Sequence, residues 1–145
     1  KYIATVAAGS RETSISVSAK MPDGTSKKMG DMKYRIKQVP RPVAQVGTLP
    51  AGSYAKGEIA LQNTLYAYLE NFVFEGVKFT VTKYRVIFMP KKGYMEEAAV
   101  SGNSAAAIKS FANKAKTGDL IVIDGIRAVG PGGEKPLNPI TYTFK

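Results

Sequence analysis

The last thirty residues of the chain constrain its fold more than any other segment. An apolar run at residues 120–123 is interrupted by Asp124-Gly125 and resumes at residues 126–129. Residues 130–133 hold one proline and three glycines, and residues 140–144 alternate between apolar and polar side chains. This pattern predicts a buried strand, a tight turn and a terminal strand that closes a sheet.

Two short helices are expected ahead of this segment. The first spans residues near 54–63 and follows Ser53, which can cap its N-terminus. The second spans residues 105–117 and follows Ser104, while Gly118 is expected to terminate it. Its apolar residues recur at the spacing of one helix face, at Ile108, Phe111, Ala112 and Ala115.

Alternating segments predict most of the remaining structure as strands. Residues 65–69 place Tyr66 and Tyr68 on one face, and residues 78–89 form the longest predicted strand. Lys91-Lys92-Gly93 is expected to turn the chain into a further strand at residues 94–100.

The beginning of the chain reads as an antiparallel meander of three strands. They are expected at residues 2–8, 14–19 and 32–39, with a turn at Pro22-Asp23-Gly24. The serines of residues 14–19 share one face, which indicates a half-buried strand. Three strands make a poor domain alone, so we expect this one to be incomplete and to be completed by strands that precede it.

Pro40 and Pro42 end the meander and form a stiff linker, because each fixes its backbone and lacks an amide donor. We therefore expect a mainly β chain with two short helices in two domains. Residues 1–46 are the C-terminal part of a first β-domain, and residues 47–145 form a C-terminal β-rich domain.

Composition argues against a catalytic role, and we predict that the chain is not an enzyme. It contains no histidine and no cysteine, which removes the usual general base, disulfides and thiolate metal sites. The carboxylates are scattered without the spacing of a metal-binding loop, so no metal and no cofactor are expected. The sequence also has no apolar run long enough to span a bilayer.

One serine-lysine pattern in the chain resembles a catalytic motif. Ser53-Tyr54-Ala55-Lys56, Ser101-Gly102-Asn103 and Lys116-Thr117-Gly118 occur in the order used by penicillin-recognising enzymes. Helix capping explains Ser53 and Gly118, and the short distance between the last two elements leaves no room for the catalytic cleft. We interpret the pattern as a coincidence.

A formal net charge of +10 favours acidic partners. The densest positive region lies near residues 27–41, where a solvated strand face is the simplest interpretation. Tyr34 points away from the basic face, so nucleic-acid binding is not expected. The candidate partner-binding residues are Lys33, Arg35, Lys37, Arg41, Lys91, Lys92 and Tyr94.

Several segments resemble the C-terminal domains of the GldM/PorM family. Residues 33–44 are similar to the family's link between its third and fourth periplasmic domains. Further similarity lies at residues 56–62, 69–72, 79–81, 111–119 and 126–131. The chain departs from the family at residues 130–133, which are usually Gly-Pro-Asp-Gly, and at Val73 after Phe72.

The resemblance implies a non-enzymatic component of the type IX secretion and gliding machinery of Bacteroidetes. Such a protein forms homodimeric rods of immunoglobulin-like β-sandwich domains in the periplasm, anchored in the inner membrane by a helix outside this sequence. It couples a proton-driven GldL/PorL-type partner to an outer-membrane-associated lipoprotein ring of the GldK/GldN or PorK/PorN type.

An adhesive or carbohydrate-binding β-sandwich module of a cell-surface protein is the alternative interpretation. It relies on exposed tyrosines such as Tyr66 and Tyr94, although aromatic residues are also ordinary strand formers.

Overall fold

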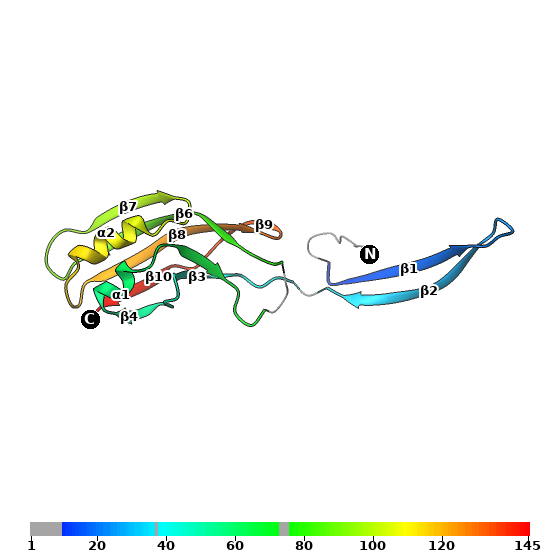
Figure 1. Ribbon diagram of the computed structural model, residues 1–145, viewed down its shortest axis with the longest axis horizontal. Coiled ribbons are helices and arrows are strands. Elements are labelled where there is room, and N and C mark those ends of the chain that lie inside the picture. Colours follow the sequence, from blue (N-terminus) through cyan, green and yellow to red (C-terminus); the bar gives the residue numbers. More distant parts are fainter. Residues whose placement is uncertain (1–9, 37, 73–75) are drawn as a thin grey trace. The chain divides into compact units, whose positions relative to one another are not determined.

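The computed structural model describes residues 10–36, 38–72 and 76–145. They fall into two compact units, Lys1–Val39 and Pro40–Lys145, which we call the first unit and the C-terminal unit (Figure 1). The described residues are mainly β with two short helices, which confirms that part of the sequence prediction.

The first unit contains an antiparallel hairpin of β1 (Glu12–Lys20) and β2 (Ser26–Arg35). The predicted turn between them is confirmed: Asp23 accepts hydrogen bonds from the backbone N–H and the hydroxyl of Thr25, at 3.0 and 2.6 Å. β2 begins and ends earlier than the predicted strand at residues 32–39. The strand predicted at residues 2–8 lies outside the described residues, as does Lys37.

The side chains of this hairpin are mostly exposed on both faces. Val17 is 56% exposed and Met32 is 61% exposed, so the prediction of a half-buried strand is wrong for the described residues. Lys33 and Arg35 still alternate with Met32 and Tyr34 along β2, as predicted. Apolar and basic side chains therefore alternate along β2 although no second layer in the described structure buries its apolar face.

The C-terminal unit is built on one large sheet. In the described part of the chain six strands form it. Five follow the order β4-β10-β8-β6-β7, and the sixth, β9, pairs with β8 alone. Their bounds are β4 Gly52–Tyr54, β6 Thr80–Met89, β7 Glu96–Ser101, β8 Leu120–Gly130, β9 Gly133–Pro136 and β10 Ile140–Phe144. β4 runs parallel to β10, and the other pairs are antiparallel.

A short ribbon of β3 (Val43–Val46) and β5 (Leu65–Tyr68) completes the strands of this unit. Because β3 pairs with β5, residues 40–46 belong to the C-terminal unit, and the division falls after Val39 rather than after residue 46. Pro40 is exposed, but Pro42 is fully buried. Pro42 is therefore part of the packed unit and not an exposed linker residue.

Both helices are shorter than predicted. α1 (Lys56–Ala60) begins after Ala55, whose N–H donates to the Glu58 carboxylate at 2.7 Å, because Gly52–Tyr54 is already committed to β4. α2 (Ala106–Lys114) ends at Lys114.

The end of α2 is set by an aspartate and not by the predicted glycine. Ala115 is extended, with ψ at 150°, and the N–H of Lys116 donates to the Asp119 carboxylate at 2.8 Å. Gly118, with φ at +90°, lies in the turn that follows. The buried residues of α2 include Ile108, Phe111 and Ala112, which confirms its predicted apolar face.

Two β-bulges, one in β6 and one in β8, lie on either side of the Lys83–Arg127 pair. Buried residues occur three apart on each strand, at Val81 and Tyr84 and at Ile123 and Ile126, where the register shifts. Asp124-Gly125 interrupts the apolar run but not the strand: Gly125 adopts φ at +59° and β8 continues through it. The bulges keep the apolar side chains on one face although strict alternation is broken.

The core lies between the sheet and a layer formed by α1, α2 and the β3–β5 ribbon (Figure 1). Phe88 on β6 stacks on Phe111 of α2 with 5.6 Å between ring centroids. Tyr142 on β10 is fully buried, accepts a hydrogen bond from Val46 N–H at 3.0 Å and donates to the Leu49 carbonyl at 2.7 Å. This hydroxyl joins the ribbon to the sheet.

Candidate functional site

The register of the strands gives the C-terminal unit two distinct ends. Val43 pairs with Tyr68, and neighbouring Ala67 bridges to Phe79, so the chain enters at the end where β6 begins. β6 finishes at Met89, opposite the start of β8. The loops at residues 90–95 and 115–119 therefore lie at the other end, which we call the lysine end (Figure 1).

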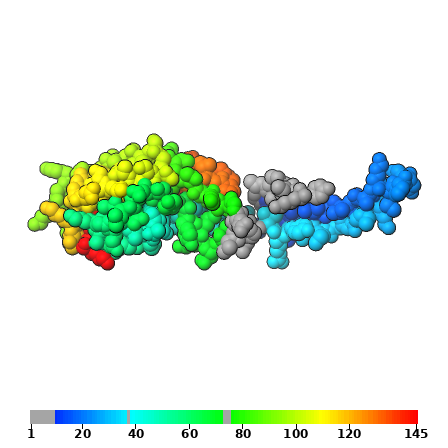
Figure 2. Space-filling view, in the orientation of Figure 1, coloured from blue at the N-terminus to red at the C-terminus, as the bar shows by residue number. Residues whose placement is uncertain are grey.

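The structure brings together only part of the predicted partner-binding set. Lys91, Lys92 and Tyr94 lie in one loop at the lysine end. The side chains of this loop protrude from the unit in Figure 2. Arg41 is exposed near the entry of the chain into the unit. Lys33 and Arg35 belong to β2 of the first unit, and Lys37 is outside the described residues.

A hollow of about 410 Å³ opens at the lysine end. It is lined by the loop after β6, by the end of α2 and by the loop before β8. Its charged lining residues are Lys91, Lys92, Glu96, Lys114, Lys116 and Asp119. Positive side chains therefore outnumber the carboxylates around it.

Asp119 holds the two loops of this hollow together. It is 5% exposed, and its carboxylate accepts backbone N–H bonds from Lys91 at 2.9 Å and from Lys116 at 2.8 Å. These hydrogen bonds lower the pKa of Asp119, against the opposing effect of burial, and the two lysine charges lower it further. The aspartate stays ionised and fixes the backbone positions from which both lysines project.

Lys114 forms a second fixed element of the hollow. Its Nζ lies 4.9 Å from the centroid of the Phe111 ring and 5.6 Å from that of Phe88. The same ammonium pairs with the Glu96 carboxylate at 2.5 Å. Glu96 is therefore neutralised by a lysine that is already packed on the core.

A second hollow of about 350 Å³ adjoins the first, because Lys116 and Thr117 line both. It adds Lys56 at the start of α1 and Lys145 beyond β10. Sequence reasoning missed Lys56, Lys114, Lys116 and Lys145 as neighbours of Lys91. Together with Lys91 they lie on four separate segments, and only Lys114 and Lys116 share one, so no local pattern could have grouped them all.

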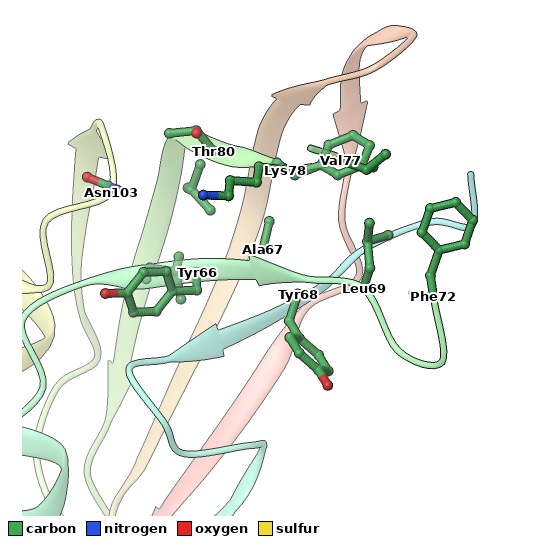
Figure 3. A pocket seen from close by; sticks show the side chains of 12 residues that line it. Tyr66, Ala67, Tyr68, Leu69, Phe72, Val77, Lys78, Thr80 and Asn103 are labelled. Atoms are coloured by element: carbon green, nitrogen blue, oxygen red, sulfur yellow. The ribbon is translucent and has the colours of Figure 1, made fainter. Parts of the chain in front are cut away.

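Away from the lysine end, an aromatic groove of about 510 Å³ lies between β5 and the start of β6. Figure 3 shows Ala67 pointing from β5 toward β6 and Tyr68 pointing to the other side of β5. Tyr66 and Tyr68 are 53% and 55% exposed, which confirms their predicted shared face. Their rings offer apolar surface next to the groove.

The serine-lysine pattern is not gathered into one cleft. Ser53 is exposed on β4, and Lys56 and Lys116 line the second hollow at the lysine end. Asn103 lines the aromatic groove instead. The interpretation of this pattern as a coincidence is therefore consistent with the structure.

Within ranges 10–36, 38–72 and 76–145, no cluster of three or more acidic, histidine or cysteine side chains could hold a metal ion. No helix in the same ranges is long and apolar enough to cross a membrane.

Comparison with known families assigns the C-terminal unit. The family described as the GldM C-terminal domain matches residues 40–145, which is the extent of this unit. A comparison with curated proteins returned no match. The family match covers most of the chain and agrees with the sequence resemblance seen at residues 56–131. The chain therefore belongs to the GldM C-terminal domain family, whose members are components of the gliding and type IX secretion machinery.

Proposed function

We propose that this chain is the C-terminal part of a non-enzymatic periplasmic subunit that couples an inner-membrane, proton-driven motor to an outer-membrane lipoprotein ring. The family match over residues 40–145 is the observation that carries the proposal. The intact subunit is anchored in the inner membrane by a region outside this sequence, through which it meets a GldL/PorL-type partner.

The form of the C-terminal unit supports a coupling role. It has a packed core, a chain entry at one end and an exposed charged surface at the other. A subunit that connects two assemblies needs attachment points at separate ends, and the strands of the large sheet join these ends directly.

The partners and the assembly complete the proposal. The chain acts as a homodimer and contacts ring proteins of the GldK/GldN or PorK/PorN type. Its domains are immunoglobulin-like β-sandwiches in tandem. The first unit is the C-terminal part of one such domain, and the C-terminal unit is the next.

Binding to the ring proteins tests this function. We expect the purified chain to bind periplasmic ring proteins in isothermal titration calorimetry at low salt. An unrelated β-protein of the same net charge serves as the control for non-specific attraction. A folded chain that binds the ring proteins no better than this control would contradict the proposal.

The exposed Tyr66 and Tyr68 beside the aromatic groove favour one second candidate, an adhesive or carbohydrate-binding module. In that case oligosaccharides would raise the melting temperature of the chain, and Tyr66→Ala would abolish the shift. Tyr34→Ala, in the first unit, is the matched control. Absence of any shift across a panel of neutral and acidic glycans would exclude this candidate.

A further inference from the structure

We propose that the lysine end of the C-terminal unit is a docking surface for an acidic segment of a protein partner. The surface consists of Lys56, Lys91, Lys92, Tyr94, Lys116 and Lys145 around the two adjoining hollows. This inference rests on the proposed coupling function and names the surface and the chemistry by which the partner is recognised.

The first argument is the unbalanced charge of this surface. Among the described residues that line the two hollows there are six lysines and only two carboxylates, Glu96 and Asp119. Glu96 forms an ion pair with Lys114, and Asp119 accepts hydrogen bonds from two backbone N–H groups. Of the six lysines, Lys114 alone makes an ion pair within the described structure. The other ammonium groups remain available to an incoming carboxylate.

The second argument is that the lysines are mounted on a rigid support. Asp119 fixes the backbone of Lys91 and Lys116, and the N–H of Gly118 donates to the Phe144 carbonyl at 2.6 Å. A Cβ placed on Gly118 would lie 2.2 Å from the Lys91 side chain, so the two loops touch. Surfaces ordered before binding lose less conformational entropy when a partner docks.

The third argument is the aromatic residue beside the lysines. Tyr94 is 93% exposed and the neighbouring Met95 is 62% exposed, on the same loop as Lys91 and Lys92. An exposed tyrosine can bury its ring against an apolar residue of a partner while its hydroxyl stays hydrated. The surface therefore fits a segment that carries carboxylates and at least one apolar side chain.

The chemistry favours an acidic protein segment over phosphate-bearing ligands. Every basic residue that lines the two hollows in the described structure is a lysine, whereas bidentate phosphate recognition favours arginine. Nucleic acid would need a basic track interleaved with several stacking aromatics, and Tyr94 is the exposed aromatic that the described lining offers. The position of the surface, at the end opposite the chain entry, suits contact with a separate protein.

A set of charge-reversal variants of the whole chain tests the inference. We compare Lys91→Glu/Lys92→Glu/Lys116→Glu with the matched control Lys20→Glu/Lys27→Glu/Lys28→Glu, which makes the same charge change on exposed lysines of the first unit. Binding is measured to purified ring proteins and to a fluorescein-labelled peptide of alternating glutamate and serine with a central tyrosine. We expect the first variant to bind both at least about tenfold more weakly, and the control to remain within about twofold.

Folding is checked by near-ultraviolet circular dichroism, and Lys91→Ser/Lys92→Ser/Lys116→Ser replaces the first variant if that one does not fold. Unchanged ring binding by a folded lysine-end variant would overturn the inference and leave the proposed function intact. Loss of peptide binding by this variant, when wild type does not bind ring proteins, would uphold the surface and refute the proposed function. Tighter wild-type binding to phosphatidylglycerol vesicles or to an oligonucleotide than to the peptide would overturn the inference.

Discussion

The β1–β2 hairpin and the β6–β8 pair show how far an alternating sequence determines structure. Both pairs are antiparallel, and both carry apolar residues on one face. Ile15 of β1 is 39% exposed, whereas Ile123 of β8 is fully buried beneath the second layer. The comparison teaches that alternation specifies strand pairing, while burial and stability depend on a layer that comes from elsewhere in the sequence.

The largest expected effect comes from removing one apolar side chain in each region. Ile123→Ala should lower the free energy of unfolding of the C-terminal unit by about 2–5 kcal/mol, because it leaves a cavity in a packed core. Ile15→Ala, in the exposed hairpin, should cost less than about 1 kcal/mol. Urea denaturation followed by near-ultraviolet circular dichroism measures both. Equal losses would show that the hairpin is packed as tightly as the core.

A smaller effect is expected from a single hydroxyl group. Tyr142→Phe removes the hydrogen bonds to the buried Val46 N–H and the half-buried Leu49 carbonyl, which should cost about 1–3 kcal/mol. Tyr34→Phe in the hairpin should change the stability by less than about 0.5 kcal/mol, since its hydroxyl lies on the surface. The same denaturation experiment compares them, and an unchanged Tyr142→Phe variant would refute the clamp between the ribbon and the sheet.

Alkaline pH should destabilise the C-terminal unit, because two of its tyrosine hydroxyls are buried. Burial raises the pKa of Tyr84 and of Tyr142 to about 12, above the ordinary value of about 10. Between these values the unfolded chain releases phenolic protons that the folded unit retains, so the C-terminal unit should lose stability as pH rises from about 10 to about 12. Urea midpoints across this range measure the loss, and Tyr142→Phe should flatten the curve. A pH-independent midpoint would contradict the burial of these hydroxyls.

The smallest expected effects come from the exposed ion pairs. Lys28 lies 2.5 Å from Asp31 on the hairpin, and Lys28→Ala should cost less than about 0.5 kcal/mol because both groups are solvated. Lys114→Ala should cost slightly more, about 1 kcal/mol, since this ammonium also lies over two aromatic rings. Thermal denaturation can rank the two variants, and a larger loss for Lys28→Ala would reverse the comparison.

Local patterns were sufficient where each residue's neighbours are close in sequence. The turn around Asp23, the apolar face of α2 and the shared face of Tyr66 and Tyr68 were all predicted, because each depends on a few adjacent residues. Apolar and polar side chains report such periodicities directly.

Features made by distant segments could not be predicted in this way. Ser53 was interpreted as a helix cap, but it lies on β4, whose parallel pairing with β10 joins residues about ninety positions apart. The bulges in β6 and β8 break alternation at both strands, so no local pattern shows that β8 continues through Asp124-Gly125. The grouping of lysines at the lysine end could not be predicted for the same reason. Its six lysines come from loops, helix ends and the C-terminus, which only the folded sheet brings together.

The direction of β6 and β8 has a mechanical consequence. The two strands span the unit between the chain entry and the lysine end in opposite directions, so a pull applied between Pro40 and a protein held at Lys91 would be directed along them. Hydrogen bonds of an antiparallel ladder lie perpendicular to the strands, so such tension strains many of them together instead of opening them one by one. The unit would yield by sliding of strands past one another, which demands far more force than peeling.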